Sequence, residues 1–401
     1  MTHSRDTDRV IIAGAGPVGL VAAAKLARAG VPVTVLEEMP TLNSESRAST
    51  FHPPTLDMLD ELGFAAPLVA QGLVASRLQY RTKRDGIIAE FDFGAIADLT
   101  KHPYRLQAEQ FKLTRIIADQ MQGTLNFELN FSSPVKGVEQ SDEGVTVILE
   151  DGKRVAGRWL IGADGAGSAV RRALGIEFEG FTWPERFLVV TTPFDFESVI
   201  DGLAAVSYVA DPEQWHFFLR ILGLWRVMFP VPGTVDDETA LGAAYVQDAL
   251  RTALPQARDK SFEVQHLTLY RVHQRVAKTF QSGRAFLAGD AAHINNPLGG
   301  MGMNGGIHDV VDLADRIVRV HRGVEGPRHL EGYDTQRRGI TLEYVQKHTV
   351  QNKRNLEARD EATRTAFRDE LLRISADPAL TRGYLERLSM IASLKRAREI
   401  R

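Results

Sequence analysis

The feature that most constrains this chain is a glycine-spaced turn near its start, Gly14-Ala15-Gly16-Pro17-Val18-Gly19. In such a turn, Gly14 permits the tight bend and Gly16 lets the backbone approach a pyrophosphate. Gly19 lets a following helix pack closely against the preceding strand. The N-terminus of that helix directs free N–H groups and a partial positive charge toward phosphates. The turn predicts a phosphate-binding loop, provided that a strand precedes it and a helix follows it.

The residues around the turn supply that context. Residues 9–13 predict a strand, residues 17–29 a helix and residues 31–36 a second strand, which together make a βαβ unit with parallel strands. Glu37 ends the second strand, where a carboxylate can bind ribose hydroxyls and disfavours a 2′-phosphate. The opening segment therefore predicts a dinucleotide site. The motif by itself does not separate FAD from NAD.

Composition narrows the class of protein. The chain has 401 residues, which predicts two or three domains, and its 44% hydrophobic and 25% charged residues are ordinary for a globular protein. A formal net charge of −3 gives no electrostatic reason to expect nucleic acid as a partner. The absence of cysteine excludes disulfides, thiol nucleophiles and Cys-ligated metal sites, and we expect no metal. No signal peptide or membrane-spanning run is recognisable, so we expect a cytoplasmic protein without a membrane partner.

Strand and helix signals alternate in a way that indicates two intertwined domains. Turns at 84–86 and 151–152 predict β-hairpins that pair 77–83 with 87–93 and 145–150 with 154–160. Other segments are predicted as helices (52–63, 107–121, 235–253, 304–320) or strands (187–192, 204–210, 215–222, 225–231, 284–290). The simplest architecture is an α/β (α+β) fold, in which an antiparallel β-sheet substrate domain is inserted into a Rossmann-like nucleotide-binding domain. We assign residues 1–71, 104–180 and 273–340 to the nucleotide-binding domain, 72–103 and 181–272 to the substrate domain, and 341–401 to a C-terminal helical segment.

A second motif lies where a predicted strand ends and a helix begins, in Leu160-Ile161-Gly162-Ala163-Asp164-Gly165-Ala166-Gly167-Ser168. Asp164, flanked by small residues, can accept hydrogen bonds at the end of the strand. Taken alone, the string is a turn in which Ser168 is the N-cap of the following helix. A functional interpretation depends on the other motifs.

A third motif, at 283–309, combines an acid with many glycines. A short buried strand ends in Asp290, and five glycines lie among the eight residues 299–306, where a helix begins. These glycines expose backbone N–H groups and let a flat ligand approach. The helix N-terminus stabilises negative charge, such as that of a reduced flavin. His293 lacks partner ligands at metal spacing, so we interpret it as a structural histidine.

These three motifs, in this order and spacing, resemble those of the class A FAD-dependent aromatic hydroxylases, the family of para-hydroxybenzoate hydroxylase and phenol hydroxylase. The resemblance runs from about residue 8 to residue 340. It implies non-covalent FAD, with the ADP half on the first motif, and an isoalloxazine ring that meets the backbone of Met303 and Asn304. The full set of implied cofactor contacts is Gly14, Gly16, Pro17, Val18, Gly19, Glu37, Glu38, Arg47, Gln110, Asp164, Asp290, Pro297, Gly300, Gly302, Met303 and Asn304.

The resemblance also implies separate roles for members of this set. Arg47 lies near the flavin and the pyrophosphate, and Gln110 contacts the cofactor. Asp164 belongs to a motif that serves both FAD and the nicotinamide cofactor. Asp290 holds the ribityl chain, and Pro297 lies beside the reactive edge of the flavin.

A reaction cycle follows from the same resemblance. NADH or NADPH, as a transient electron donor, reduces FAD, and reduced FAD reacts with O2 as co-substrate to give a C4a-hydroperoxide. That species transfers one oxygen atom to an electron-rich aromatic or heteroaromatic small molecule that carries a hydroxyl or amino group. The cofactor supplies the chemistry, while the protein orients the reactants and excludes water. The sequence names neither the substrate nor the preferred nicotinamide, and it is compatible with a monomer or a homodimer.

The predicted strand 215–222 offers candidates for positioning that substrate. Its odd-numbered residues are uniformly apolar, and we expect them to face a core. The other face is mixed and carries His216 and Arg220, while Tyr208 lies on a neighbouring predicted strand. With Pro297, these three are our catalytic-site candidates, because they could orient or deprotonate a phenol. The alternative is that they are solvent-facing residues of the sheet.

Four other functions fit part of the pattern. A flavin-dependent reductase or dehydrogenase would use the same scaffold without inserting oxygen. A non-catalytic FAD-binding protein would have no need to retain residues 297–304. A nicotinamide-only dehydrogenase would leave the Asp290 loop without a purpose. A flavin halogenase would carry a W-x-W-x-I-P segment, and the nearest string, at 225–230, lacks the second tryptophan and the isoleucine.

Overall fold

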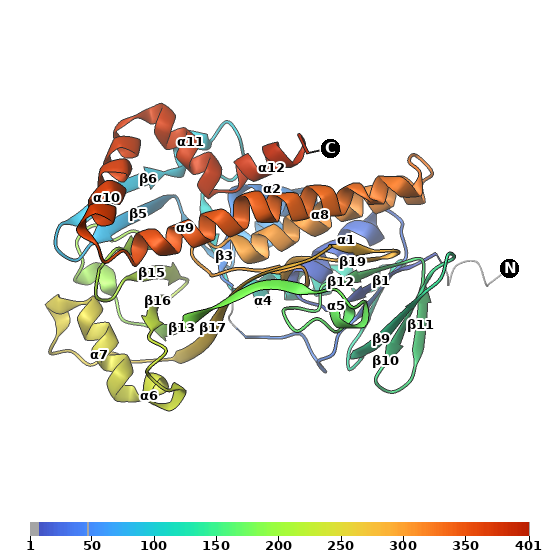
Figure 1. Ribbon diagram of the computed structural model, residues 1–401, viewed down its shortest axis with the longest axis horizontal. Helices are drawn as coiled ribbons and strands as arrows, with labels where there is room; N and C mark the ends of the chain where they lie inside the picture. The colour runs from blue at the N-terminus through green and yellow to red at the C-terminus, as the bar shows by residue number, and fades with distance from the viewer. Residues whose placement is uncertain (1–7, 46–47, 401) are drawn as a thin grey trace.

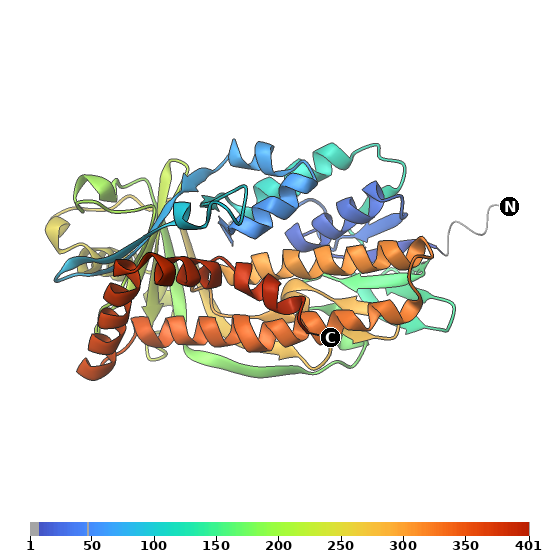
Figure 2. The ribbon, with the colours of Figure 1, turned by 90° about the horizontal axis from the view of Figure 1, so that it is seen from above.

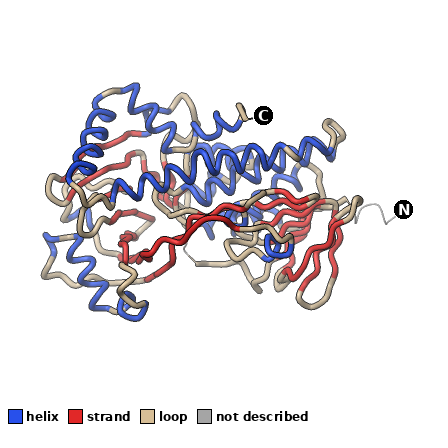
Figure 3. The backbone as a smooth tube through the Cα atoms, viewed as in Figure 1, coloured by secondary structure: helices blue, strands red, loops and turns tan. Residues whose placement is uncertain are grey.

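The structure, a computed structural model, describes residues 8–45 and 48–400. Figure 1 shows an elongated molecule whose strands gather in two groups, one near the N-terminus and one at the opposite end. Two long strands, β13 (Phe178–Thr192) and β17 (His266–Ala277), run from one group to the other (Figure 3). This mixed architecture of several sheets and many helices agrees with the fold class predicted from the sequence.

A six-stranded sheet forms the group near the N-terminus, in the order β18-β19-β12-β1-β2-β8. Its strands are β1 (Val10–Ala13), β2 (Val33–Leu36), β8 (Phe127–Asn130), β12 (Trp159–Gly162), β18 (Gln281–Ser282) and β19 (Ala285–Leu287). β1 pairs in parallel with both β2 and β12, and helix α1 (Pro17–Arg28) connects β1 to β2. The predicted βαβ opening is confirmed, and a crossover helix is what a parallel pair requires.

The core of this half is large and apolar. All four residues of β1 are buried, as expected for a parallel strand that is covered on both faces. Helices α1, α4 (Gln110–Met121) and α8 (Met301–His321) bury their apolar faces in it. A small sheet of β9 (Val135–Gln140), β10 (Val145–Leu149) and β11 (Arg154–Gly157) joins the same core through β10. The hairpin of β10 and β11 is confirmed, but residues 159–162 leave it to become β12.

An eight-stranded sheet forms the opposite group, in the order β20-β17-β13-β16-β15-β14-β5-β6. Its other strands are β5 (Arg77–Thr82), β6 (Gly86–Asp92), β14 (Val206–Val209), β15 (His216–Ile221), β16 (Leu224–Val231) and β20 (His293–Ile294). The predicted hairpin of 77–93 is confirmed as β5 and β6. Apolar clusters cover both faces. One includes residues of α6 (Asp237–Leu241) and α7 (Ala243–Ala253), and the other includes residues of the C-terminal helices.

The C-terminal helices are α9 (Lys347–Leu356), α10 (Glu361–Ala376), α11 (Pro378–Leu388) and α12 (Ile391–Ala397). Figure 2 shows α10 and α11, in red, at the end of the molecule where β5 and β6 lie. Two π-helical segments, Asp334–Arg338 and Thr341–Gln346, lead into α9. Together they form a long helical stretch that runs alongside α8 (Figure 1). In the described ranges, no helix combines the length and the apolar character needed to span a membrane.

A fourth sheet, called the small sheet below, is formed by strands that lie in the chain between β2 and β5 and between β6 and β8. It has the order β3-β7-β4, with β3 (Thr50–Phe51), β4 (Leu73–Ala75) and β7 (Arg105–Gln107), and helices α2 (Pro53–Glu61) and α3 (Ala65–Val69) connect β3 to β4. The helix predicted for 107–121 therefore starts later, at Gln110. The pairing of β7 with β3 and β4 is non-local, so local periodicity could not show it. The division of the chain into domains remains a prediction.

Glycines bring α1 and α8 unusually close together. A Cβ on Gly306 of α8 would lie 2.7 Å from Cγ2 of Val18 in α1 and 2.8 Å from Cα of Gly289. Within the first motif, a Cβ on Gly19 would lie 2.0 Å from the carbonyl oxygen of Gly14. Real Cβ atoms do not approach other atoms this closely, so Gly19 lets α1 pack on the turn at Gly14 and Gly306 lets the two helices meet. Their first turns consequently lie together beside the turn Gly289–Ala291.

Candidate active site

The glycine-spaced turn offers an open cradle at the start of α1. Gly14 has a φ of +100°, and a Cβ there would lie 2.5 Å from the carbonyl oxygen of Ala163. A Cβ on Gly16, in contrast, would meet no atom within 4 Å. The fold itself therefore needs Gly14, whereas Gly16 borders open space. This difference fits a pyrophosphate that approaches the backbone at Gly16.

Glu37 is held at the same turn by backbone hydrogen bonds. Its carboxylate accepts from the N–H of Ala15 at 2.6 Å and from the N–H of Met39 at 3.0 Å. The side chain is half-buried directly after β2, the position at which the sequence predicts a ribose contact, while Glu38 is exposed. The arrangement orients one carboxylate beside the cradle and leaves the neighbouring one in solvent.

The N-termini of α1 and α8 lack protein caps. Each helix begins after a glycine, Gly16 or Gly300, that provides no capping side chain, and neither has an acid in its first turn. Side chains cap α5 (Ala169–Ala173), α6, α10 and α11, through Ser168, Asp236, Asp360 and Asp377. The helices α2, α3, α4, α7, α9 and α12 also begin without a side-chain cap. Free N–H groups and the helix dipole favour negative charge. A pyrophosphate at α1 and the negatively charged edge of a reduced flavin at α8 fit these two ends.

The second motif supports the turn that carries Asp290. Asp164 accepts hydrogen bonds from Ser168 Oγ at 2.5 Å and from the N–H of Val170 at 3.1 Å. From α5, Arg171 donates to the carbonyl oxygen of Ala291 at 2.8 Å. Asp290 lies exposed in the turn that this bond holds. Within the fold, the carboxylate of Asp164 stabilises the start of α5, which is the structural role that the isolated string indicates.

The loop before α8 is attached to the eight-stranded sheet. Gly299 and Gly300 have φ values of +104° and +69°, a region that glycine adopts without strain. The N–H of Gly299 donates to Tyr208 Oη at 3.2 Å, and Leu298 packs in the same apolar cluster as Tyr208. Pro297 is half-buried at the start of this loop, and its carbonyl accepts from the N–H of Gly300 at 2.9 Å. Pro297 and Tyr208 are therefore brought into one region.

Asn304 joins α8 to the small sheet. Its Nδ2 donates to the carbonyl oxygens of Thr50, at 2.8 Å, and Gly300, at 2.6 Å. Its Oδ1 accepts from the N–H of His52 at 2.9 Å. Because the side chain is fully buried and used within the protein, only its backbone is available to a ligand, as the resemblance implies. Gly302 and Met303, in the same helical turn, are half-buried.

Several buried polar atoms beside this loop have no protein partner. They are His52 Nδ1, Arg105 Nε, Gln107 Nε2 and Asn295 Oδ1. Buried donors and acceptors without partners are costly, so their gathering at one place fits a bound polar ligand. Burial, and the nearby positive charge of Arg105, lower the pKa of His52 well below its usual value. The neutral ring donates from Nε2 to the carbonyl oxygen of Gly299 at 2.8 Å, which leaves Nδ1 as an acceptor.

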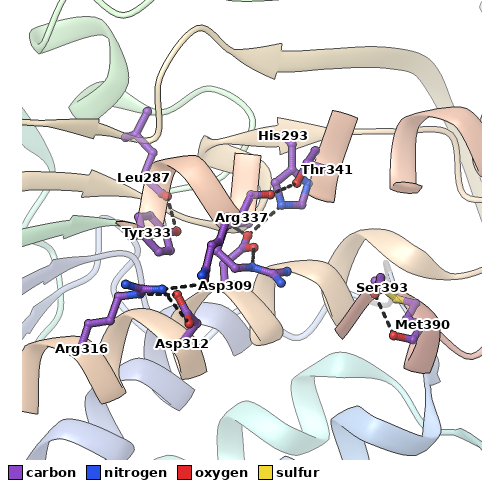
Figure 4. Close-up of polar contacts among 12 residues, drawn as sticks. Leu287, His293, Asp309, Asp312, Arg316, Tyr333, Arg337, Thr341, Met390 and Ser393 are labelled. Carbon is purple, nitrogen blue, oxygen red and sulfur yellow. Dashed lines mark hydrogen bonds and ion pairs between the residues drawn. The ribbon is translucent and has the colours of Figure 1, made fainter. Parts of the chain in front are cut away.

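Beneath the loop, a buried ionic network holds α8 (Figure 4). Asp309 of α8 accepts hydrogen bonds from His293 Nε2 and from Arg337 Nε, both at 2.8 Å, and from the N–H of Gly289 at 3.3 Å. Burial alone would raise the pKa of Asp309, but Arg337 and His293 outweigh it and lower the pKa to about 2. The carboxylate thereby joins α8, the Asp290 turn and the π-helical segment. His293 has the structural role that the sequence indicates.

In the sequence, the predicted cofactor residues Gln110 and Arg47 lie at or before the start of α4. Gln110 begins α4, where its N–H donates to the carbonyl oxygen of Ala48 at 2.9 Å, and its side chain is half-buried. Gln107, three residues earlier at the end of β7, has the fully buried amide with an unpartnered Nε2, and its Oε1 accepts from Thr50 Oγ1 at 2.8 Å. Arg47 lies outside the described residues. The contacts of these residues with a cofactor remain predictions.

The structure contradicts the grouping of His216 and Arg220 with Tyr208. His216 pairs across the sheet with Val209, so both lie on the face opposite to Tyr208. It is buried between Phe218 and Phe229, and burial lowers its pKa to about 4. Arg220, on the same face, is about 40% exposed and pairs with Glu197 at 2.6 Å. The uniformly apolar face of β15 is the one that faces the loop, since Phe217 and Leu219 pack in the same apolar cluster as Leu298.

Sequence reasoning did not find His52, Arg105 or Gln107. Arg105 and Gln107 flank Leu106, which packs in the core, so they point to the opposite side of β7. The polar–apolar–polar string Arg105-Leu106-Gln107 was the one available signal. It is too short to distinguish a strand from the start of the next helix.

Comparisons with known proteins bear on this site. The family described as the FAD binding domain matches residues 7–348. Para-nitrophenol 4-monooxygenase from a Pseudomonas species is 32% identical over 386 residues, which cover 94% of each chain. The 6-hydroxy-3-succinoylpyridine 3-monooxygenase of Pseudomonas putida is 35% identical over 354 residues, covering 87% of this chain and 88% of that protein. The crystal structure of p-nitrophenol 4-monooxygenase from Pseudomonas putida superposes with a TM-score of 0.89 at 30% identity, covering 96% and 98% of the two chains.

We predict that Asp309→Asn destabilises the fold strongly, because it leaves Arg337 buried without an anion. Breaking a buried ion pair costs about 3–5 kcal/mol. The depressed pKa means that the carboxylate contributes its full stabilisation above pH 3.8 and loses it as the pH falls toward 2. Urea unfolding of the apoproteins should show a large loss in the free energy of unfolding of Asp309→Asn relative to wild type at neutral pH, and a smaller loss at pH 3.

Asp312→Asn is the matched control. It lies one turn later in α8 and pairs with Arg316 at 2.8 Å, but its side chain is 32% exposed. Arg316 is buried but also donates to His329 and Gln336, so we expect this i,i+4 pair with a partly exposed acid to contribute about 0.3–0.5 kcal/mol. If Asp309→Asn lost no more stability than Asp312→Asn, the network would not hold α8 as described.

We predict that Gly16→Val abolishes FAD retention without unfolding the protein, because the new side chain projects into the space proposed for the pyrophosphate. Gly326→Val is a close control. Gly16 and Gly326 both have extended backbone, both precede a proline, and a Cβ on either would meet no atom within 4 Å. Far-UV circular dichroism and flavin absorbance of the purified variants should show two folded proteins, of which only Gly326→Val is yellow. A yellow Gly16→Val protein would contradict the cradle.

Proposed function

We propose that this chain, which belongs to the class A FAD-dependent aromatic monooxygenases, uses NADH or NADPH and O2 to hydroxylate a hydroxy- or amino-substituted aromatic or heteroaromatic small molecule. It is a flavoprotein aromatic hydroxylase, as its family membership establishes. In the proposed reaction one oxygen atom of O2 replaces a ring hydrogen as a hydroxyl group. The other leaves as water, with two electrons from the nicotinamide and one proton from solvent.

Bound FAD would supply hydride acceptance and activation of O2, and the residues of this chain would hold and orient the reactants. The cradle at Gly16 and the carboxylate of Glu37 would bind the ADP half. The open N-terminus of α8 would stabilise negative charge on the ring system. The loop 297–300 would set the distance between that ring system and the substrate, and closure by the surrounding apolar side chains would exclude water.

One observation carries this proposal. The loop 297–300 leads directly into the uncapped N-terminus of α8, and at Gly299 it is hydrogen-bonded to Tyr208 on the eight-stranded sheet. Tyr208 stacks on Tyr80, with ring centroids 5.4 Å apart, and contacts Phe217 at 5.5 Å. An anion-stabilising helix end and an aromatic surface therefore meet at one loop. A ring-hydroxylating flavoenzyme needs both, because its cofactor becomes anionic and its substrate is a planar aromatic molecule.

The relatives indicate where the search for a substrate should start. Their names specify a nitrophenol and a hydroxypyridine as the compounds on which those monooxygenases act. We therefore propose phenols and hydroxypyridines as the substrate class of this chain.

The deciding experiment is a stepwise reaction of the purified holoenzyme. Its visible spectrum is recorded, NADH or NADPH is added without oxygen, and ¹⁸O2 is then admitted with a panel of phenols and hydroxypyridines. We expect bleaching that one aromatic compound accelerates, followed by a product that carries one ¹⁸O atom. Flavin reduction without a labelled product for any compound would favour a reductase or dehydrogenase. A protein without flavin would contradict the cofactor.

We predict that Tyr208→Phe uncouples the reaction, because the buried N–H of Gly299 loses its acceptor and the loop loses its anchor. An unsatisfied buried N–H costs about 1–3 kcal/mol, enough to shift the loop. The ratio of hydroxylated product to NAD(P)H consumed should fall, with hydrogen peroxide making up the difference. Arg220→Gln is the control, since its partner Glu197 is exposed and lies on the far face. Equal coupling in the two variants would argue against a role for Tyr208.

A further inference from the structure

Arg105 is the most deeply buried arginine in the described part of the chain, at 1% exposure. Its guanidinium donates to the carbonyl oxygens of Gly299 at 3.4 Å and Leu388 at 3.5 Å, both at the limit of a hydrogen bond. Its Nε has no partner. A guanidinium carries five N–H donors and stays charged, so burial in this condition leaves most of its hydrogen-bonding capacity unused.

The other buried arginines of the described residues are better satisfied. Each has at least one hydrogen bond of 2.9 Å or shorter: Arg81 to Gln79, Arg171 to Ala291, Arg226 to Ser49, Arg316 to Asp312 and Arg337 to Asp309. Arg316 and Arg337 also form ion pairs with these acids. Arg105 forms no ion pair with any acid in residues 8–45 and 48–400. Within the described ranges, the protein therefore buries a positive charge that no acidic side chain pairs with.

A buried charge without a counterion is expensive, and proteins retain it where a ligand supplies the counterion. The unpartnered Nδ1 of His52 and Nε2 of Gln107 are buried in the same region. These two neutral groups can complete the hydrogen bonding of a polar ligand but cannot neutralise the guanidinium.

The surroundings of Arg105 are aromatic. The guanidinium carbon lies 5.8 Å from the centre of the Phe93 ring. Burial raises the pKa of the Tyr80 and Tyr384 hydroxyls, and the positive charge of Arg105 partly opposes this rise. Tyr384 Oη donates to Tyr80 Oη at 2.9 Å. Arg105 therefore lies between the loop at Gly299 and the aromatic side chains that face it.

We propose that Arg105 binds an anionic oxygen substituent of the aromatic substrate, a phenolate or a carboxylate, and so selects anionic over neutral rings. This assignment rests on the proposed function for the identity of the ligand as a substrate. A planar guanidinium matches the two oxygens of a carboxylate and also binds a single phenolate oxygen strongly. The aromatic neighbours accommodate the ring, and the loop 297–300 holds it beside the cofactor site.

The test measures binding to the oxidised holoenzyme, without turnover. Changes in flavin absorbance report the dissociation constants of two nearly isosteric pairs, 4-hydroxybenzoate with 4-hydroxybenzamide and 4-nitrophenol with 4-nitroaniline, at a pH where the nitrophenol is ionised. We expect wild type to prefer the anionic member of at least one pair. The first pair reports a carboxylate site and the second a phenolate site.

Arg105→Gln should remove this preference. We expect anion binding to weaken roughly tenfold or more, the fold-change typical for loss of a charge-assisted hydrogen bond, while neutral compounds change little. Arg105→Lys keeps the charge and should retain part of the preference. It keeps the test informative if Arg105→Gln fails to fold. Arg81→Gln is the matched control, since Arg81 is also buried, on the opposite face of the eight-stranded sheet.

Several results would overturn the assignment. Equal weakening of anionic and neutral compounds in Arg105→Gln would mark a structural role. An unchanged preference would place the anion elsewhere. A shift in the flavin reduction potential without any change in ligand selectivity would assign the charge to the flavin. Because binding is measured without NAD(P)H, a failure to hydroxylate would contradict the proposed function but would leave this selectivity test intact.

Discussion

The position of the first turns of α8 governs the whole site. Gly306 touches Val18 of α1 and Gly289 at distances that exclude a Cβ, so α8 can approach the dinucleotide motif only through glycine. Two residues earlier, Asn304 binds the backbone of β3 through its side chain. The same helix end therefore contacts the phosphate cradle and the small sheet. Moving it by a fraction of an ångström would disturb both, because packed interiors do not deform continuously.

Charge is distributed unevenly around this helix. Below it, Asp309 pairs with Arg337 and accepts a hydrogen bond from His293, so the carboxylate is satisfied within the protein. At its start, Arg105, His52 and Gln107 retain buried polar atoms without partners. A satisfied buried network rigidifies the structure, whereas buried polar atoms without partners are costly. The fold thus uses the contacts of Asp309 to hold the helix. Some of its unpartnered buried groups lie beside the loop where we propose that reactants bind.

The sheet that faces the loop shows the limit of pattern analysis. Alternation along 215–222 correctly separated two faces, but the polar residues His216 and Arg220 lie on the face away from the loop. The rule that a mixed face meets a ligand or solvent fails here, because α6 and α7 cover one side and the C-terminal helices cover the other. Tyr208 came from the same reasoning and does contact the loop. Because neighbouring residues of a strand point to opposite faces, Tyr208 faces the loop whereas His216 and Arg220 do not.

The sequence by itself determined the βαβ opening, the two hairpins, the family and the positions of the glycines and acids around the cofactor motifs. These depend on local backbone requirements, and glycine spacing and turn chemistry are written in consecutive residues. Only the tertiary structure decided that Arg105 and Gln107 lie on a central strand beside Gly299, and that Asp309 joins His293 to Arg337. Strand pairing and ionic contacts between residues far apart in the chain depend on packing, which local periodicity does not encode.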